Sequence, residues 1–199
     1  MKRRASQAIS DAANGPKVAP PFATNYVLNS SLTQYQNAEF LAIDTEFLRE
    51  RTYYPQLCLI QISDGVDAVA IDPLAPNLDL NPLWDLMRNQ NITKVFHAGN
   101  QDMEIFLHLM GSLPEPIYDT QIAAMVCGLG DQVGYDKLVK AMLNHDIDKT
   151  SRFTDWSKRP LSNRQIVYAL DDVIYLAELY PLMRSKLEAE NRSHWLDDE

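Results

Sequence analysis

Residues 40–63 read FLAIDTEFLRERTYYPQLCLIQIS, and they hold two apolar runs that decide the fold. The runs at 40–47 and 56–63 have the length and composition of strands. The turn signal Asp64-Gly65 follows them, and DAVAID at 67–72 is a third run of the same kind. Three consecutive strands predict an antiparallel meander.

The later part of the chain alternates between helix and strand patterns. Helices are predicted at 82–90 and 100–110, the second with Asn100 at its cap. Strands are predicted at 92–98 and 116–120, and most of the remainder has a helical pattern. Because strands that alternate with helices add to a sheet in parallel, we expect an α/β fold. Its mixed central sheet would combine an antiparallel meander with parallel strands and be flanked by helices.

The length and composition indicate one domain. The chain has 199 residues, of which 46% are hydrophobic, enough for one core and too few for two ordinary domains. We expect a flexible tail at 1–22 and the domain at 23–199. No apolar run approaches the ~20 residues of a membrane span, and the N-terminal stretch lacks the apolar centre of a secretory signal. Cys58 and Cys127 lack metal-ligand spacing and indicate reduced packing residues, as in a cytoplasmic protein.

The net charge of −9 restricts how the chain can bind nucleic acid. Such a body repels phosphate polymers at long range, so a binding site must depend on local cations or on bound metal. Residues 149–164 hold one acid, Asp155, and five basic residues: Lys149, Arg152, Lys158, Arg159 and Arg164. This segment is the best candidate for phosphate contacts. The alternative is a solvated connection in which Arg159, before Pro160, ties the loop to its neighbours.

Four carboxylates stand at positions that suit metal binding. Asp44 and Glu46 end the first strand, and its period of two points both side chains to the same side. Asp102 lies in the first turn of the helix that follows the strand at 92–98, at the edge where sites on such sheets gather. Each acid has a simpler interpretation, either as a solvated strand end or as a charge that stabilises a helix.

A later helix supplies the fourth acid and a phenol. Ser162 and Gln165 form a capping box that opens this helix, and Tyr168 and Asp172 are four residues apart on one of its faces. An ordinary tyrosine and a surface aspartate are the alternative. Together with Asp44, Glu46 and Asp102, Asp172 could bind two divalent ions, Mg²⁺ or Mn²⁺, for phosphodiester hydrolysis.

Three segments resemble the exonuclease motifs of the ribonuclease D family: residues 40–63, VFHAGNQDMEIF at 95–106, and YALDDV at 168–173. IDPL, YDTQIAA and DKTSRFTDWSKRPLS extend the resemblance, which covers about residues 38–190. It implies the ribonuclease H-like fold and a metal-dependent 3′-5′ exoribonuclease that releases nucleoside 5′-monophosphates. The implied catalytic residues are Asp44, Glu46, Asp102, Tyr168 and Asp172, with the four acids as metal ligands and Tyr168 assisting the attacking water.

The resemblance also implies a substrate, RNA with a free 3′ end, and an association with transfer RNA 3′ processing. Five residues are expected to contact it: Thr45, Phe47, His97, Lys149 and Arg159. For His97, a hydrogen-bonded core residue is the alternative. Tyr53 and Tyr54 follow Arg49 and Arg51 and could stack on the terminal base, or pack under their loop. Bacterial ribonuclease D proteins usually continue into helical nucleic-acid-binding (HRDC) domains, and we expect no such domain within these 199 residues.

Other functions fit part of the pattern. A 3′-5′ DNA exonuclease would use the same five residues, because nothing in the metal site reads the sugar. A catalytically silent nucleic-acid-binding module would keep the fold, although decayed sites usually lose a metal ligand. An unrelated acidic interaction domain explains the charge but not the motif spacing. The sequence does not indicate protein partners.

Overall fold

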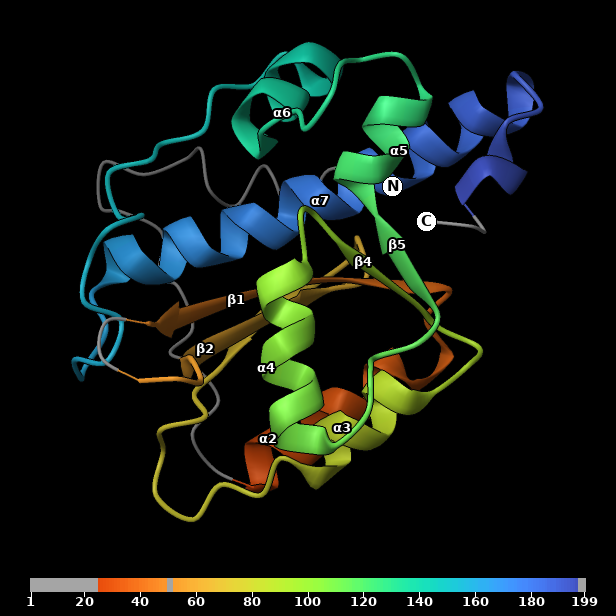
Figure 1. Ribbon diagram of the computed structural model, residues 1–199. Helices are drawn as coiled ribbons and strands as arrows, with labels where there is room; N and C mark the ends of the chain where they lie inside the picture. The colour runs from red at the N-terminus through yellow and green to blue at the C-terminus, as the bar shows by residue number, and fades with distance from the viewer. Residues whose placement is uncertain (1–24, 50–51, 197–199) are drawn as a thin grey trace.

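The computed structural model describes residues 25–49 and 52–196 and shows a five-stranded mixed sheet between two layers of helices (Figure 1). The order is β3-β2-β1-β4-β5, and the bounds are β1 Phe40–Leu48, β2 Gln56–Ser63, β3 Ala68–Ile71, β4 Thr93–Phe96 and β5 Ile117–Asp119. The tail predicted at 1–22 lies outside the described residues.

The strand pairing confirms the predicted mixed sheet. β1 pairs antiparallel with β2, and β2 pairs antiparallel with β3, which gives the meander. β4 adds parallel to β1, and β5 adds parallel to β4. The β1–β2 register shifts between Glu46 and Phe47, and such a bulge twists a strand and redirects its side chains. The irregularity therefore falls at the acidic end of β1.

Helices cover the two faces of the sheet unequally. One face packs against α2 Asn25–Leu32, α3 Asn81–Arg88 and α4 Asn100–Met110 (Figure 1). A 3₁₀ turn, η1 Thr33–Asn37, leads from α2 toward β1. The other face is crossed by α7 Asn163–Ala189, with α5 Thr120–Val126, α6 Tyr135–Leu143 and η2 Ser193–Leu196 on that side. No helix of the described part is long and apolar enough to cross a membrane.

The alternation of side chains along β1 separates the core from the site. Leu41 and Ile43 point to the α2–α4 face, whereas Ala42 packs under α7 with Val95 and Val173. By the same period of two, Asp44 and Glu46 lie on the α7 side. The two acids thus follow the core residue Ala42 on the same face of β1, toward the C-terminal end of the strand.

Two helix starts illustrate local sequence control. Ser162 Oγ accepts from the Gln165 backbone N–H, and the Gln165 side chain accepts from the Ser162 N–H, which confirms the predicted capping box of α7. The predicted cap at Asn100 is wrong by one residue: Gly99 precedes α4, and no side chain caps it. The turn before α4 is fixed instead by a distant carboxylate, described below.

Candidate active site

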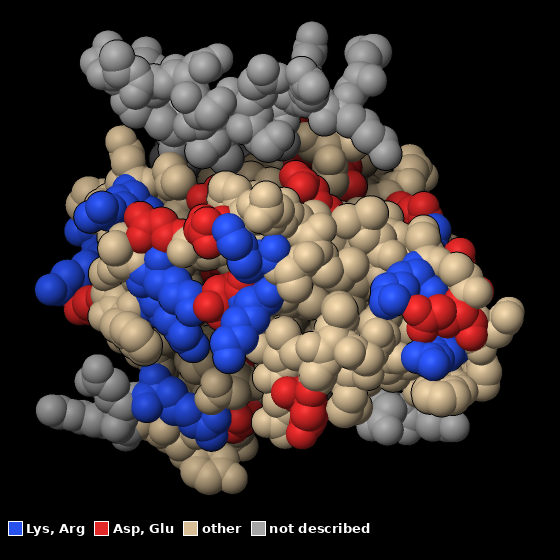
Figure 2. Space-filling view, turned by 90° about the horizontal axis from the view of Figure 1, so that it is seen from above, with Lys and Arg blue, Asp and Glu red and all other residues tan. Residues whose placement is uncertain are grey.

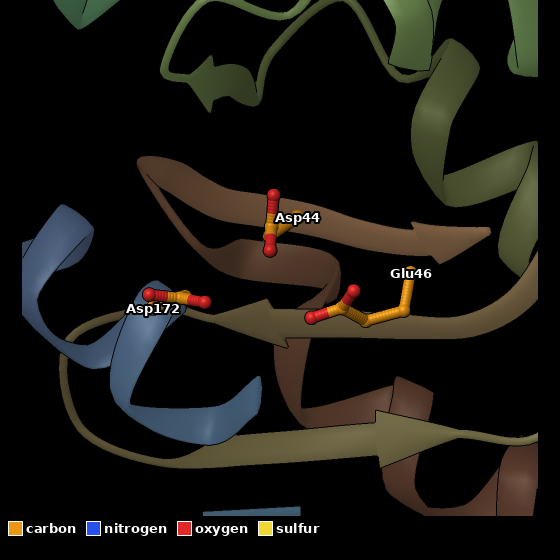
Figure 3. Close-up of side chains that lie close together, drawn as sticks. All are labelled: Asp44, Glu46 and Asp172. Carbon is orange, nitrogen blue, oxygen red and sulfur yellow. The ribbon is translucent and has the colours of Figure 1, made fainter. Parts of the chain in front are cut away.

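Three carboxylates from two elements converge on the α7 side of the sheet. Asp44 and Glu46 come from β1 and Asp172 comes from α7, and one oxygen of each lies within 4.8 Å of the others. Figure 3 shows these side chains facing a common space. Val173 and Leu176 of α7 pack in the core, which fixes the helix where its buried Asp172 meets the other two acids.

Asp102 approaches the same cleft from α4, on the other side of the sheet edge. It is not one of the three acids within 4.8 Å of one another. The Thr45 hydroxyl donates a hydrogen bond to Asp102 Oδ1, and both residues line the cleft with the three acids. Thr45, predicted to contact substrate, therefore orients the fourth predicted ligand in this structure.

The turn that places Asp102 is held by Asp119 at the end of β5. Its carboxylate accepts hydrogen bonds from the backbone N–H groups of Ala98 (3.0 Å) and Gly99 (2.9 Å). Ala98 has φ of +55°, a conformation that costs energy for a residue with a side chain. A Cβ on Gly99 would lie 2.9 Å from Phe96 Cβ, so glycine is required there. Asp119 thus stabilises a strained turn directly before α4.

Burial raises the pKa of all four carboxyl groups. For Asp44, repulsion from Asp172, Asp102 and Glu46 adds to burial and lifts its pKa well above the usual range. Burial followed by repulsion from Asp172 raises the pKa of Glu46 to about 9. The pKa of Asp102 rises to about 6 and that of Asp172 to about 7, in both cases mainly through burial.

This donor set fits a hard divalent cation. Carboxylate oxygens are the ligands that Mg²⁺ and Mn²⁺ prefer, and three of them already converge on one space. Without a cation, the raised pKa values mean that the acids must share protons or repel one another. A bound cation would remove that conflict, because it stabilises the ionised forms that burial disfavours.

Tyr168 stands beside the acids as the sequence predicts. It lines the cleft, packs beside Trp156 with ring centroids 6.1 Å apart, and forms a hydrogen bond with Asp172 that lowers the pKa of that acid. Burial, and then repulsion from Asp172, raises the pKa of Tyr168 above its usual range. The phenol therefore stays protonated and available as a hydrogen-bond donor.

Tyr135 at the start of α6 is a site residue that the sequence did not reveal. Its hydroxyl donates to the backbone oxygen of Asp172, and burial raises its pKa well above the usual range. Its ring packs against His97, with centroids 5.3 Å apart. The two partners of this hydrogen bond are 37 residues apart, so no local pattern pointed to it.

The acids line a cleft of about 610 Å³. Four of the five predicted substrate-contacting residues also line it: Thr45, Phe47, His97 and Lys149. His97 Nδ1 lies 3.0 Å from Thr120 Oγ1, and burial lowers its pKa, so the imidazole is a neutral, hydrogen-bonded wall of the cleft. This agrees with the structural alternative for His97 as well as with a contact to substrate.

Arg159 does not line the cleft, and its predicted substrate contact is not supported. All five N–H donors are used within the protein. Two bonds of 2.7 and 2.6 Å reach the Asp72 carboxylate, and the others reach the carbonyl oxygens of Cys58, Trp156 and Lys158. With no donor left for a phosphate, Arg159 instead ties the connection before α7 to the sheet.

The basic rim of the cleft comes from the connection between α6 and α7. Lys149 and Arg152 are the cations that line it among the described residues, although Lys149 is paired with Asp136 at 2.5 Å. Phe153 beside them is 92% exposed. On the face drawn in Figure 2, Lys and Arg gather in groups mixed with acids, in a chain whose net charge is −9. Arg152 was only one of five candidates in sequence.

The two tyrosines after β1 are arranged away from the acids. Tyr54 stacks on His108 with centroids 3.9 Å apart, and Tyr53 is 81% exposed. Neither lines the cleft. Arg49 forms a double hydrogen bond with Glu104, and Arg51 lies outside the described residues. The structure therefore favours packing for Tyr54 against α4.

The chain is similar to known nucleases over nearly its whole length. The family model described as 3′-5′ exonuclease matches residues 21–188. Ribonuclease D of Zymomonas mobilis is 52% identical over 184 residues, which are 92% of this chain and 47% of that protein. The chain thus spans about half the length of this relative.

Solved structures extend the comparison. Escherichia coli RNase D, described as an exoribonuclease involved in structured RNA processing, is 40% identical with a TM-score of 0.86, over 91% of this chain and 48% of that one. Brucella melitensis NrnC with bound Mg²⁺ is 31% identical with a TM-score of 0.74, over 84% and 82%. The same protein bound to pGG has a TM-score of 0.75. The fold and the matched residues together show that the chain belongs to the 3′-5′ exonuclease family, in its ribonuclease D branch.

Proposed function

We propose that this domain is a metal-dependent 3′-5′ exoribonuclease that releases nucleoside 5′-monophosphates from RNA 3′ ends. The observation that carries the proposal is the convergence of Asp44, Glu46 and Asp172 in a cleft that also holds Asp102 and Tyr168. Support comes from the relatives named ribonuclease D and from the NrnC structures with Mg²⁺ and with pGG.

The four acids would hold the divalent cations. Their arrangement in two parts would allow two ions to bind. Asp44, Glu46 and Asp172 form one group, and Asp102 stands beyond it as a further ligand in the same cleft. Divalent cations at such a site supply an activated water and neutralise charge on the phosphate and the leaving oxygen. We propose Mg²⁺ or Mn²⁺ for this role.

The remaining steps fall to the protein's own groups. The protonated Tyr168 hydroxyl, bonded to Asp172, would orient the attacking water in line with the scissile phosphate. Arg152 and Lys149 stand at the rim and would contact the phosphate backbone. Thr45 would keep Asp102 in place through its hydroxyl. Phe47 and His97 would form the wall against which the terminal nucleotide lies.

Substrate choice belongs to the proposal as well. We propose RNA rather than DNA, with transfer RNA precursors as one substrate class and the cytoplasm as the compartment. The acids recognise a phosphodiester and not its sugar, so preference must arise from contacts to the 2′-hydroxyl in the cleft.

The test uses matched 5′-labelled RNA and DNA oligonucleotides with Mn²⁺ or Mg²⁺. We expect a ladder that shortens from the 3′ end, faster on RNA, and lost in EDTA. Faster shortening of DNA would instead support the DNA exonuclease alternative. Tight RNA binding without cleavage under any metal condition would support a silent binding module.

A further inference from the structure

Gln61 is a fully buried amide with no hydrogen-bond partner. It lies in the middle of β2 and is 0% exposed, and within the described residues neither Oε1 nor Nε2 has a partner. Its neighbours in sequence, Ile60 and Ile62, belong to the hydrophobic core. An unsatisfied buried amide lowers the free energy of unfolding by on the order of 1–3 kcal/mol. The protein would therefore be more stable with leucine or methionine at this position.

The position of Gln61 explains why an amide is found in the core. In the β1–β2 register, Gln61 is the direct partner of Asp44. Directly opposed residues of an antiparallel pair point to the same face, with Cβ atoms about 4.5–5.5 Å apart. Its partner on the other side is Ala70, whose side chain offers no hydrogen-bonding group. The Gln61 side chain therefore begins next to that of Asp44, a candidate metal ligand, on the α7 face of the sheet.

The chemistry of the pair is complementary. Asp44 is partly buried, and its acidic neighbours Asp172, Asp102 and Glu46 supply no hydrogen-bond donor when they are ionised. A carboxylate that binds a cation through one oxygen is usually hydrogen-bonded through the other. Gln61 Nε2 carries two N–H donors, and its side chain has the length and freedom to reach across the strand pair.

We propose that Gln61 is a positioning residue for the metal site: its amide donates to Asp44 when that acid is ionised and bound to a divalent cation. This inference rests on the proposed function, because it assumes a cation at the acids. The amide thus lowers the stability of the metal-free protein and raises the affinity of the site for the divalent cation. It touches neither substrate nor cation, so it acts only through Asp44.

The test separates metal affinity from folding. Gln61→Met keeps the volume and removes both donors, and Ser63→Ala is the matched control on the same strand. Ser63 is also buried, but its hydroxyl donates to the Asp67 oxygen at 2.9 Å, and its register partner is Ala42. Mn²⁺ affinity is measured by titration calorimetry, and Tm is measured in EDTA.

We expect Gln61→Met to raise the Mn²⁺ Kd about 10-fold or more and to raise Tm in EDTA. Ser63→Ala should lower Tm and leave the Kd unchanged. Should Gln61→Met fail to fold, Gln61→Asn keeps the amide but is one methylene shorter, and it should also weaken Mn²⁺ binding. An unchanged Kd in the folded variant overturns the inference while the metal site stands. No Mn²⁺ binding by the wild type would overturn the metal site itself.

Discussion

Replacing Asp44 with asparagine should stabilise the protein in the absence of metal. Asp44 lies beside Glu46 and Asp172, and one oxygen from each acid lies within 4.8 Å of the others. Two carboxylates at that distance repel by about 3 kcal/mol at an effective dielectric constant of ~20. Protons shared within the group relieve part of this repulsion, so we expect the variant to gain about 2 kcal/mol. For a domain of this size, that gain raises Tm by roughly 4–8 °C.

The pH dependence has a defined sign. The folded-state pKa values of these acids, about 9 for Glu46 and about 7 for Asp172, lie above the values of about 4 expected for the unfolded chain. The folded state therefore binds more protons, and stability falls as pH rises from about 4 to 9. The gain from Asp44→Asn should be small at pH 5 and should grow as the pH rises toward about 9.

The assay is differential scanning calorimetry in EDTA and in Mn²⁺. The wild type should gain more from Mn²⁺ than Asp44→Asn does, because the variant has lost a charged ligand. A lower Tm for Asp44→Asn in EDTA at pH 8 would show that the carboxylate forms a stabilising contact and would refute the reasoning from repulsion.

Three further variants test separate parts of the site. Tyr168→Phe should lower kcat by about 10²-fold at saturating Mn²⁺, since the hydroxyl orients water; wild-type turnover would remove it from the mechanism. Arg152→Ala should raise KM for RNA with little change in kcat. Lys158→Ala, on the same connection but outside the cleft, should behave as wild type. Equal effects of the two substitutions on the steady-state KM would contradict a phosphate contact by Arg152. Arg159→Ala should destabilise the fold by about 3 kcal/mol in urea unfolding, because Asp72 is left unpaired, with activity per folded molecule retained; an unchanged midpoint would contradict its structural assignment.

Local sequence patterns predicted the strands of the sheet and the side of β1 on which the acids lie. Such patterns depend only on residues that are close together in the sequence. The period of two fixes the side of β1 that carries Asp44 and Glu46, and the capping box fixes where α7 begins. The roles of the five catalytic residues were implied by the resemblance, and they remain proposals. Their geometry shows that four of them lie on two elements and Asp102 on a third.

Features that depend on distant partners were not predictable. Arg159 was assigned to substrate from its charge, but its carboxylate partner is 87 residues away in sequence. The hydrogen bond from Thr45 to Asp102 joins residues 57 apart, and the support of the α4 turn comes from Asp119 on β5. In the sequence, Gln61 is only a polar residue within an apolar run. Its relation to Asp44 depends on the β1–β2 register, which the sequence does not give.

The central claim is metal-dependent hydrolysis from the RNA 3′ end by the converging acids. The most direct measurement is the identity of the first product from 3′-end-labelled RNA with Mn²⁺, for the wild type and for Asp44→Asn at equal folded concentration. We predict a labelled nucleoside 5′-monophosphate released by the wild type and none by the variant. Labelled oligonucleotides as first product, or equal release by Asp44→Asn, would contradict the account.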